Sequence, residues 1–588
     1  MKKGLLIFAG FAAALGISAQ VAQAPKAVWG NLIDGDTAAG DQATSMSIDS
    51  DGNVYWYGNY GSTKSEPDVN YAGEFLFSGA LYDAGTTQNN NYTLLKTDKD
   101  GKKLWCVYTD SGDFANNAGF CSVTPDGGVL TVAKVRHTDG MTDKNIIFHN
   151  ADGTPFEIDW KCERRYYRLA VTKISADGMI EWNRMVDFST EPGPSAGGNY
   201  ATFWPDVFNV SGGTVDDDGN IYIALNYRNP MTVPTGSGDA SKVFTPVNNK
   251  TWNGDSQVVC GDFMLLSLDS KGYYRNALEL EGTCAASYCQ KAEYSAGKVY
   301  CQGYIVGEND EVLKAGDFSL SPSSIMSPVI MAVDKDLNPV WAKCYKGEKV
   351  GGKNALQNVG ISPIGSALYV CGQYNLKFSD PADPEKFVTA TQGNLREGFV
   401  LKLDAATGEW LAARDSRDDN WDKPSAVAKT GLTGYFQVIP SPTTTSSVFV
   451  FGYVMNAQVG VFLREYNAET LEAVLPAGQY NIVTGGGVPS CQYAALDNAS
   501  GALYITARGN QAFNLSDDLT TPAPVKWGVL AARYDLGAPI STVINNLTNE
   551  DIEAEAEYFT LQGIRVTNPG AGIYICRKGT KTSKVIIK

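Results

Sequence analysis

Two β-hairpin signatures alternate along this chain, and each of them occurs seven times. The first is a turn followed by a strand in which aliphatic and Tyr residues precede a small residue. The second is a strand, a turn and, in most copies, a Trp. The first lies at 49–58, 124–133, 216–225, 296–303, 366–372, 446–452 and 500–507, and the second at 94–105, 171–182, 265–276, 330–341, 400–410, 461–471 and 529–539. Repetition at a long period with four short strands per unit is typical of propeller blades. We therefore predict an all-β fold with a seven-bladed β-propeller over residues 25–540.

The beginning of the predicted propeller also indicates how the ring closes. The segment Trp29-Gly30-Asn31 parallels Trp105-Cys106-Val107, and both are followed by a hairpin turn at a similar distance. We therefore expect residues 27–33 to form the outer strand of the seventh blade, beside 528–535. Such pairing of the two ends removes exposed sheet edges.

The connections between the two signatures are unequal in length. Long links are expected near 61–91, 136–167, 228–261, 308–327, 375–397 and 508–527, and one short link at 455–458. Because strands alternate in direction, these links leave from one end of a blade and the tight turns from the other. Long connections in compact domains are often functional, so we expect a ligand at the link-rich end. Several links carry a Phe that we interpret as packing against a blade: Phe77, Phe244, Phe318, Phe378 and Phe513.

The N-terminus predicts export. Lys2 and Lys3 precede a short apolar run, and small residues allow cleavage after Ala19 or Ala24, so residues 1–24 read as a signal peptide. We expect a protein of the cell surface or the extracellular medium, with the periplasm as the alternative. No later segment is apolar enough to be predicted to span a membrane. The net charge of −16 disfavours nucleic-acid and anionic-lipid partners.

The cysteines do not follow a disulfide framework. There are 11, and several of them, such as Cys301 and Cys371, stand within the repeated strands where small buried residues are expected. Cys284 and Cys289 are close together in a predicted loop, so a disulfide between these two is the pairing that the sequence leaves open.

Parts of the repeats resemble a known group of proteins. Residues 317–345 resemble the propeller repeats of exported proteins from Bacteroidetes-type bacteria, which are loosely related to quinoprotein-like propellers. The spacings Gly101-to-Trp105 and Gly178-to-Trp182 match the quinoprotein pattern in which a Trp docks between blades. The resemblance implies the fold over most of 27–540. It implies no quinone cofactor, because the adjacent Cys pair of such dehydrogenases has no counterpart here, and we expect no cofactor.

The C-terminus resembles the sorting domain of the type IX secretion system. The residues that fit this pattern are Tyr558, Leu561, Gly563, Arg565, Val566, Gly572, Ile573, Tyr574 and Lys588. The resemblance implies a small β-sandwich-like domain over 558–588 and the secretion machinery as its partner. The acidic, Asn-rich segment 541–557 is expected to be a linker.

The Asp- and Gly-rich turns raise the question of calcium. In a calcium loop of the EF-hand type, the twelfth position carries a Glu. Counted from Asp49, Asp98 and Asp216, that position falls on Tyr60, Thr109 and Tyr227. We therefore interpret these segments as hairpin turns and predict no metal site there.

Other catalytic patterns are poorly supported. Ser195 stands in a G-x-S-x-G match, but its surroundings read as a loop rather than a strand–turn–helix. The chain has 2 His, His137 and His149, which makes a Ser hydrolase or a zinc site with several His a poor fit. The 64 acidic residues leave pairs of carboxylates for glycoside cleavage open. We assign no catalytic residue.

Trp residues divide into repeating and non-repeating positions. Trp29, Trp105, Trp182, Trp341 and Trp410 repeat, and together with Trp56 they are expected in the core, whereas Trp527 is ambiguous. Trp160, Trp204, Trp252 and Trp421 lie in links at the link-rich end, and Arg164 stands close to the first of them. Exposed Trp stacks on sugars or anchors protein partners, and Arg suits carboxylates. The alternative is that these aromatics pack the links onto the propeller.

These patterns favour a non-catalytic, exported binding or scaffold propeller that recognises a glycan or a protein. The predicted ligand-binding residues are Trp160, Arg164, Trp204, Trp252 and Trp421. The alternative is a carbohydrate-active enzyme, a glycoside hydrolase or polysaccharide lyase, with acidic residues near the central channel. A structural component of the cell surface without a small ligand is the third hypothesis.

Overall fold

The computed structural model describes the chain in a series of ranges, all of which are strands, turns or irregular segments. They are residues 24–33, 42–59, 75–76, 92–109, 113–136, 145–158, 167–189, 208–238, 240–247, 261–308, 310–350, 356–390, 397–416, 433–454, 460–474, 479–487, 490–524, 527–539, 556–560, 565–566, 572–578 and 581–587. Within these ranges the fold is all-β, as predicted, and no helix there is long and apolar enough to cross a membrane. The chain divides into two units, Met1–Ala538 and Pro539–Lys588.

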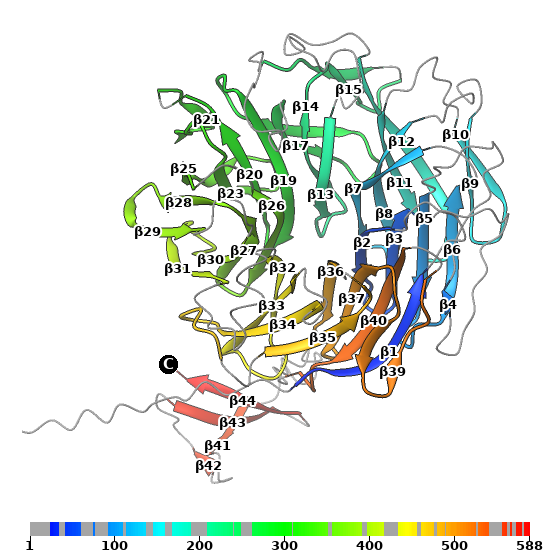
Figure 1. Ribbon diagram of the computed structural model, residues 1–588, viewed down its shortest axis with the longest axis vertical. Helices are drawn as coiled ribbons and strands as arrows, with labels where there is room; N and C mark the ends of the chain where they lie inside the picture. Colours follow the sequence, from blue (N-terminus) through cyan, green and yellow to red (C-terminus); the bar gives the residue numbers. More distant parts are fainter. Residues whose placement is uncertain are drawn as a thin grey trace, which may run out of the picture. The chain divides into compact units, whose positions relative to one another are not determined.

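The first unit is built from antiparallel sheets that repeat one pattern. Seven sheets formed by its described residues share a core of four strands that lie in chain order across the sheet, apart from the outer strand of the last sheet (Figure 1). We number them sheet 1 to sheet 7 in chain order. The inner strands are β2 (Gln42–Ile48), β7 (Asp113–Val123), β13 (Phe208–Val215), β19 (Ala286–Ser295), β26 (Leu356–Ile364), β32 (Thr433–Pro440) and β36 (Ser490–Asp497).

The remaining core strands follow in the same sheet order. The second strands are β3 (Val54–Asn59), β8 (Val129–Arg136), β14 (Ile221–Tyr227), β20 (Lys298–Val306), β27 (Ala367–Tyr374), β33 (Ser447–Val454) and β37 (Ala502–Gly509). The third strands are β5 (Tyr92–Thr97), β11 (Arg168–Ile174), β17 (Asp262–Leu268), β23 (Ser327–Asp334), β30 (Glu397–Asp404), β34 (Gly460–Asn467) and β40 (Gly528–Asp535). The outer strands are β6 (Lys103–Thr109), β12 (Ile180–Phe188), β18 (Tyr274–Glu279), β24 (Pro339–Cys344), β31 (Trp410–Asp415), β35 (Gln479–Gly485) and, for sheet 7, β1 (Lys26–Ile33).

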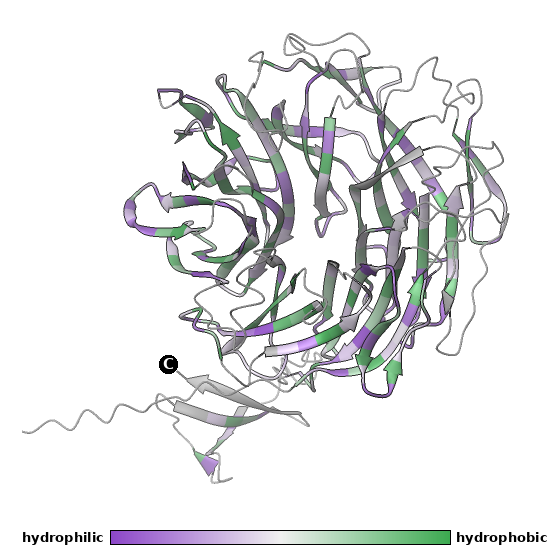
Figure 2. Cartoon of the chain, viewed as in Figure 1, coloured by the Kyte–Doolittle hydropathy of each residue, from purple (hydrophilic) through white to green (hydrophobic). Residues whose placement is uncertain are grey.

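Neighbouring sheets pack face to face in a cyclic order. Each inner strand contacts the inner strand of the next sheet, and β36 contacts β2, so the series of contacts returns to its start. A buried hydrophobic cluster lies between each pair of consecutive sheets, including sheets 7 and 1. Along β40, Val529 and Ala531 face sheet 1 while Leu530 and Ala532 face sheet 6, as the two-residue period of a strand requires. Hydrophobic residues accordingly run along the strands of all seven sheets (Figure 2), and the architecture is of the β-propeller type.

The N-terminal strand closes this ring in the predicted place. β1 pairs antiparallel with β40, with Leu32 opposite Leu530 and Ile33 opposite Val529. Both Leu32 and Ile33 are fully buried. A strand from the beginning of the chain therefore completes the sheet formed by its end.

The long links do more than connect strands. Most of them form short strands that extend the outer edge of the preceding sheet: β9 pairs with β6, β15 with β12, β38 with β35, and β4 with β1. The strands outside the seven cores are β4 (Phe75–Leu76), β9 (Ile146–His149), β10 (Pro155–Ile158), β15 (Met231–Pro234), β16 (Ser241–Phe244), β21 (Leu313–Ala315), β22 (Phe318–Leu320), β25 (Lys346–Lys349), β28 (Leu376–Asp380), β29 (Asp383–Thr389), β38 (Phe513–Ser516) and β39 (Leu519–Thr520). Of these, β21 and β22 form a small sheet of their own, and so do β25, β28 and β29. Much of the link-rich end is thus used to join neighbouring sheets, which the link lengths alone did not predict.

The Phe residues of these links pack as predicted. Phe244, Phe378 and Phe513 are buried, and Phe318 is half-buried against the hydrophobic clusters. Phe378 contacts Tyr345 of sheet 4 and Trp410 of sheet 5. Phe77 lies outside the described residues.

Repeated Trp residues lock one sheet to the next. The outer-strand Trp of one sheet lies against a Gly in the outer hairpin turn of the following sheet: Trp29 on Gly101, Trp105 on Gly178, Trp182 on Gly272 and Trp341 on Gly408. A Cβ on these glycines would lie 2.5 to 3.1 Å from the ring atoms. The indole N–H of Trp105 also donates to the carbonyl of Ala176 in the same turn, at 2.9 Å. We call each such contact a Trp–Gly clamp.

Among the described residues, three of the seven interfaces lack the clamp: those between sheets 3 and 4, 5 and 6, and 6 and 7. At the first two, both partners change together. Asn276 occupies the Trp position of sheet 3 and Ala412 that of sheet 5, as the strand registers show. The turns that follow carry Leu337 and Leu471 in place of Gly, with φ of 64° and 58°. The prediction that Trp410 holds the repeat position is therefore wrong by two residues, although the prediction that it is buried is confirmed.

The second unit is a four-stranded sheet in the order β42-β41-β43-β44. Its strands are β41 (Ala556–Phe559), β42 (Arg565–Val566), β43 (Gly572–Lys578) and β44 (Lys581–Ile587). Glu557 is held by two arginines, with ion pairs to Arg565 and Arg577. The described residues of this unit form one sheet, so the second layer of the expected sandwich is not among them.

Replacing Gly178 with Ala tests the clamp. Its added Cβ would meet Trp105 at 2.9 Å and Ala151 at 2.6 Å. The control is Gly127→Ala, because Gly127 has the same φ of 82° but open space around it. We expect Gly127→Ala to lower the free energy of unfolding by about 1 kcal/mol through backbone strain, and Gly178→Ala by about 1–3 kcal/mol more through overpacking. Denaturant unfolding measures both, and equal losses would contradict the clamp.

Deleting the N-terminal strand tests the closure. Removal of residues 25–33 from the leaderless chain should lower the free energy of unfolding by at least about 3 kcal/mol, because two fully buried aliphatic side chains and a sheet edge are lost. A chain ending at residue 540 is the control, since it lacks only the second unit. Thermal unfolding followed by circular dichroism compares the two, and a deletion without effect on Tm would argue against closure by this strand.

Candidate functional site

The five predicted ligand-binding residues lie outside the described residues. They are Trp160, Arg164, Trp204, Trp252 and Trp421. Along the chain, Trp204 and Trp421 precede the inner strands β13 and β32, and Trp160 and Trp252 precede the third strands β11 and β17. All four Trp residues thus belong to connections of the link-rich end, and their role remains a prediction.

The Asp-rich turns serve as hairpin turns, as predicted. Asp49 accepts hydrogen bonds from the backbone N–H groups of Asp51 and Asn53 at 3.1 and 2.9 Å. Asp98 and Asp216 do the same in their own turns. Their carboxylates are therefore used to fix the backbone, and the described residues contain no group of three or more potential metal ligands.

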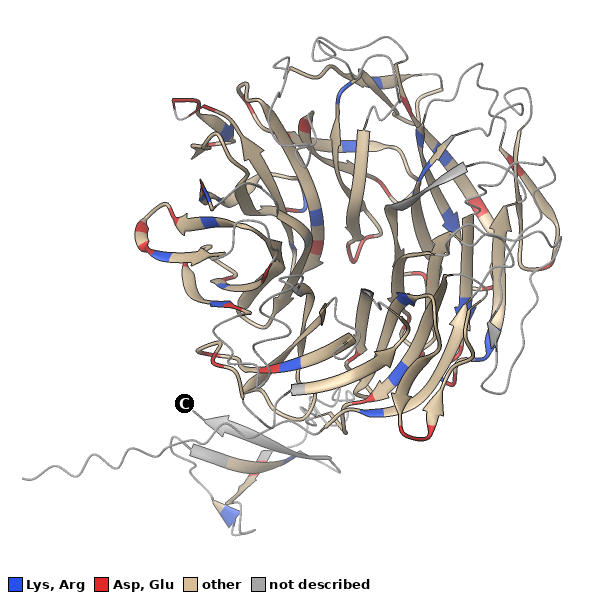
Figure 3. Ribbon diagram, in the orientation of Figure 1, with Lys and Arg blue, Asp and Glu red and all other residues tan. Residues whose placement is uncertain are grey.

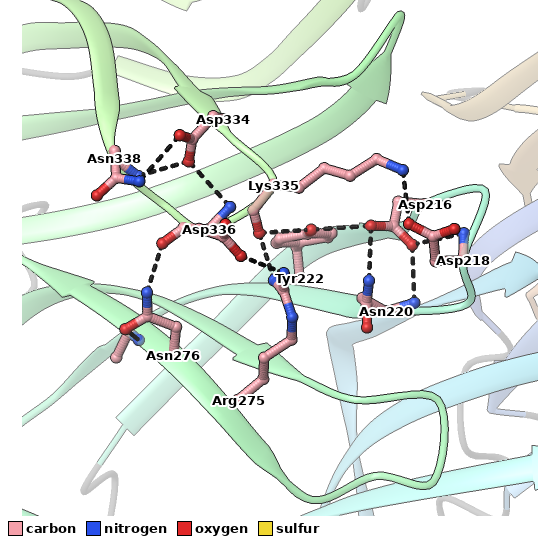
Figure 4. Close-up of polar contacts among 11 residues, drawn as sticks. Asp216, Asp218, Asn220, Tyr222, Arg275, Asn276, Asp334, Lys335, Asp336 and Asn338 are labelled. Carbon is pink, nitrogen blue, oxygen red and sulfur yellow. Dashed lines mark hydrogen bonds and ion pairs between the residues drawn. The ribbon is translucent and has the colours of Figure 1, made fainter.

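The turns of sheets 3 and 4 form a polar network in place of the missing clamp (Figure 4). Asn276, at the Trp position, donates to the carbonyl of Asp336, and Arg275 contacts both Asp336 and the carbonyl of Lys335. Lys335 pairs with Asp218 at 2.7 Å, and the hydroxyl of Tyr222 donates to Asp216 at 3.0 Å. These groups are hydrogen-bonded or paired with one another, so we interpret the network as a structural contact between sheets 3 and 4.

The inner strands share a second irregular feature, close to the axis of the ring. Each of the seven described inner strands has a β-bulge or similar break in register before its turn. The first paired residues after the breaks are Ser45, Gly119, Gly212, Lys291, Gly360, Gln437 and Tyr493. Bulges redirect side chains and are common next to active sites. Four of these positions carry small residues, which leaves room for the other three.

Lys291 and Tyr493 meet at this level from different sides of the ring. The ammonium of Lys291 lies 5.5 Å from the centre of the Tyr493 ring. Sheets 4 and 7 are not neighbours, so this contact spans the middle of the ring (Figure 1). The side chain of Lys291 passes over Gly212, where a Cβ would lie 2.7 Å from its Cδ.

Glu293 lies two residues beyond Lys291, on the same face of β19. We call Lys291, Glu293 and Tyr493 the axial cluster. All three side chains are half-buried, and burial raises the pKa of Glu293 to about 7 although the nearby Lys291 lowers it. Burial also lowers the pKa of Lys291, and Glu293 opposes that change. Away from the strand ends, these are the charged residues of the described inner strands, which are otherwise uncharged (Figure 3).

The axial cluster bears on the possibility of catalysis. A carboxyl group with a pKa near 7 suits general acid or base chemistry. Cleavage of glycosides by the usual mechanism needs two carboxyl groups flanking the bond, and the described middle segments of the inner strands provide one, Glu293. These residues could not be predicted as a site from the sequence, because a break in strand register has no recognisable residue spacing.

The cysteines of sheets 3 and 4 remain thiols. Cys284 and Cys289 are both buried and no disulfide joins them, so the pairing left open by the sequence is not formed. They belong to one hydrophobic cluster, in which Cys289 neighbours Cys301 across the hairpin. Burial raises the pKa of Cys344, near Cys284, to about 12. These thiols are inert packing groups.

Comparisons with known proteins give weak similarities. No family model and no curated protein matches the sequence. Among solved structures, the quinohemoprotein alcohol dehydrogenase of Comamonas testosteroni matches with a TM-score of 0.35 and 11% identity, over 88% of this chain and 77% of that one. A protein of unknown function from Dyadobacter fermentans matches with 0.36 and 10%, over 87% and 99%. The extracellular region of plexin A4 matches with 0.33 and 8%, over 88% and 40%. TM-scores of this size carry no argument about function.

The raised pKa of Glu293 predicts how stability depends on pH. An acid that holds its proton more tightly in the folded state stabilises the fold fully below its ordinary pKa of 4.5, and that contribution is lost as the pH rises through about 7. We expect the free energy of unfolding of the native chain to fall relative to Glu293→Gln between about pH 5 and pH 8. Denaturant unfolding at several pH values checks this, and parallel curves would contradict it.

Proposed function

We propose that the seven sheets are the blades of one closed propeller, and that this exported protein binds a glycan or a protein at its link-rich end without catalysing a reaction. One observation carries the proposal. Short hairpin turns end the blades on one side, whereas most connections on the other side are long, and they differ from blade to blade. Variable segments held on a rigid scaffold are the usual place for recognition.

The residues that we propose to contact the ligand remain Trp160, Arg164, Trp204, Trp252 and Trp421. The described Trp residues support this choice by contrast: Trp29, Trp105, Trp182, Trp341 and Trp410 all have packing partners within or between sheets. The four link Trp residues are not required by the repeat, and Trp is suited to stacking on sugars or anchoring a protein.

The two ends of the chain complete the proposal. Residues 1–24 would direct export, and the sheet of the second unit would act as a sorting domain of the type IX secretion system in a Bacteroidetes-type bacterium. Its paired strands β43 and β44 contain the Gly-Ile-Tyr segment and the basic end on which the resemblance rests.

A carbohydrate-active enzyme is the second candidate, and Glu293 favours it. This carboxyl group combines a pKa of about 7 with a position near the axis. If the protein is such an enzyme, it should release reducing ends or unsaturated products from polysaccharides, and Glu293→Gln should abolish that release. A propeller that only binds gives no product with either chain.

Alanine variants test the binding surface. Individual replacement of Trp160, Arg164, Trp204, Trp252 and Trp421 by Ala should weaken binding to glycan arrays or cell-surface extracts, and the residues at the centre of the contact should lose at least about tenfold. Trp527→Ala is the matched control, because its ring is already covered by Arg508, 4.8 Å from the ring centre. Unchanged binding by a variant carrying all five substitutions would overturn the assignment of this surface.

A further inference from the structure

The axial cluster contains polar groups that the rest of the protein does not use. Among the described residues, the ammonium of Lys291 has neither a hydrogen-bond acceptor nor an ion-pair partner, and it lies over the face of Tyr493. The carboxyl group of Glu293 and the hydroxyl of Tyr493 likewise have no hydrogen-bond partner there, and none of these atoms is sealed from solvent. Because these atoms reach solvent, their hydrogen-bonding capacity is open to water or to a ligand.

The position of the cluster makes packing an insufficient explanation. Gly212 and Gly360 are small at this level for a clear reason: a Cβ there would lie 2.7 Å from Lys291 and 2.0 Å from the carbonyl oxygen of Phe436. No such constraint requires a cation in sheet 4 and a phenol in sheet 7. The neighbouring inner strands β13 and β26 carry no charged residue that would pair with Lys291.

We propose that the axial cluster is a binding site for a small organic acid that carries hydroxyl groups. Its carboxylate would accept hydrogen bonds from the ammonium of Lys291, the best cation available near the axis. Its hydroxyl groups would pair with the carboxyl group of Glu293 and the hydroxyl of Tyr493.

The charge of Glu293 sets the pH at which this ligand binds. An ionised Glu293 repels a carboxylate, whereas its protonated form donates a hydrogen bond. The other titratable groups near Tyr493 are Tyr57 and Cys121, and burial raises the pKa of both, so they stay neutral. Affinity should therefore increase as the pH falls through about 7.

Titration of the full chain with sodium glucuronate, followed by calorimetry and ligand-observed NMR, tests the site, with glucose as the uncharged comparison. We expect glucuronate to bind and glucose not to compete. Lys291→Met should weaken binding at least tenfold, whereas Lys298→Met, on the other strand of the same hairpin, should leave it unchanged. Glu293→Gln should remove the pH dependence.

A chain that does not bind glucuronate, or one in which Lys291→Met binds as well as Lys298→Met, would overturn the proposal. If Lys291→Met does not fold, Tyr493→Phe gives the second test, with a smaller loss of affinity expected from the missing hydroxyl. The proposal does not use the link Trp residues. Replacement of Trp160, Trp204, Trp252 and Trp421 should leave glucuronate binding intact, so the two proposals fail separately.

Discussion

The contact between a Trp of one sheet and a Gly of the next is the constraint on which the ring depends. A flat indole fits against a turn only if that turn has no side chain, and the turn itself requires a positive φ, which Gly adopts at least cost. The same residue thus satisfies the backbone and the packing. Each clamp joins the outer strand of one sheet to the outer hairpin turn of the next, so it constrains how the two sheets pack.

At two of the three interfaces without a clamp, the Trp and the Gly are both replaced, which shows that these two residues depend on each other. Where Asn276 or Ala412 stands in place of Trp, the turn has space, and Leu337 and Leu471 fill it even though a positive φ costs a Leu about 1 kcal/mol or more. Both leucines are buried in the cluster between their sheets. Burial of an aliphatic side chain returns about 1.5–3 kcal/mol, which is enough to offset that strain. The Gly in the other turns is therefore required by the packed Trp and not by the backbone conformation of the turn alone.

The strands, the turns and the closing strand could be predicted from the sequence, because Asp and Gly in turns and the two-residue alternation of strands are local signals. The pairing of the link strands with the preceding sheet could not be predicted. β4 has two residues and β9 has four, too few for periodicity, and their partner is chosen by the free edge of another sheet. The prediction for Trp410 failed because the turns differ in length. The turn that begins at Asp404 closes on Glu409, one residue later than the turn from Asp98 to Lys102, so the position of the Trp cannot be counted from the Asp. Lys291 and Tyr493 are far apart in sequence, and they meet only because each follows a bulge at the same level.

Packing determines the outer half of each sheet far more than the level of the bulges. The clamps and the added strands lie at the outer edges of the sheets, where a change on one sheet forces a change on the next, whereas the hydrophobic clusters also include residues of the inner strands. After the bulges, by contrast, the residues on sheets 4, 6 and 7 are Lys291, Gln437 and Tyr493, three half-buried polar side chains that differ in charge and shape. Stability favours small or apolar residues in such a confined place, since polar groups there lose hydration. Their presence is explained if the residues after the bulges bind a ligand, because the outer strands already hold the ring together and leave these inner positions free to vary.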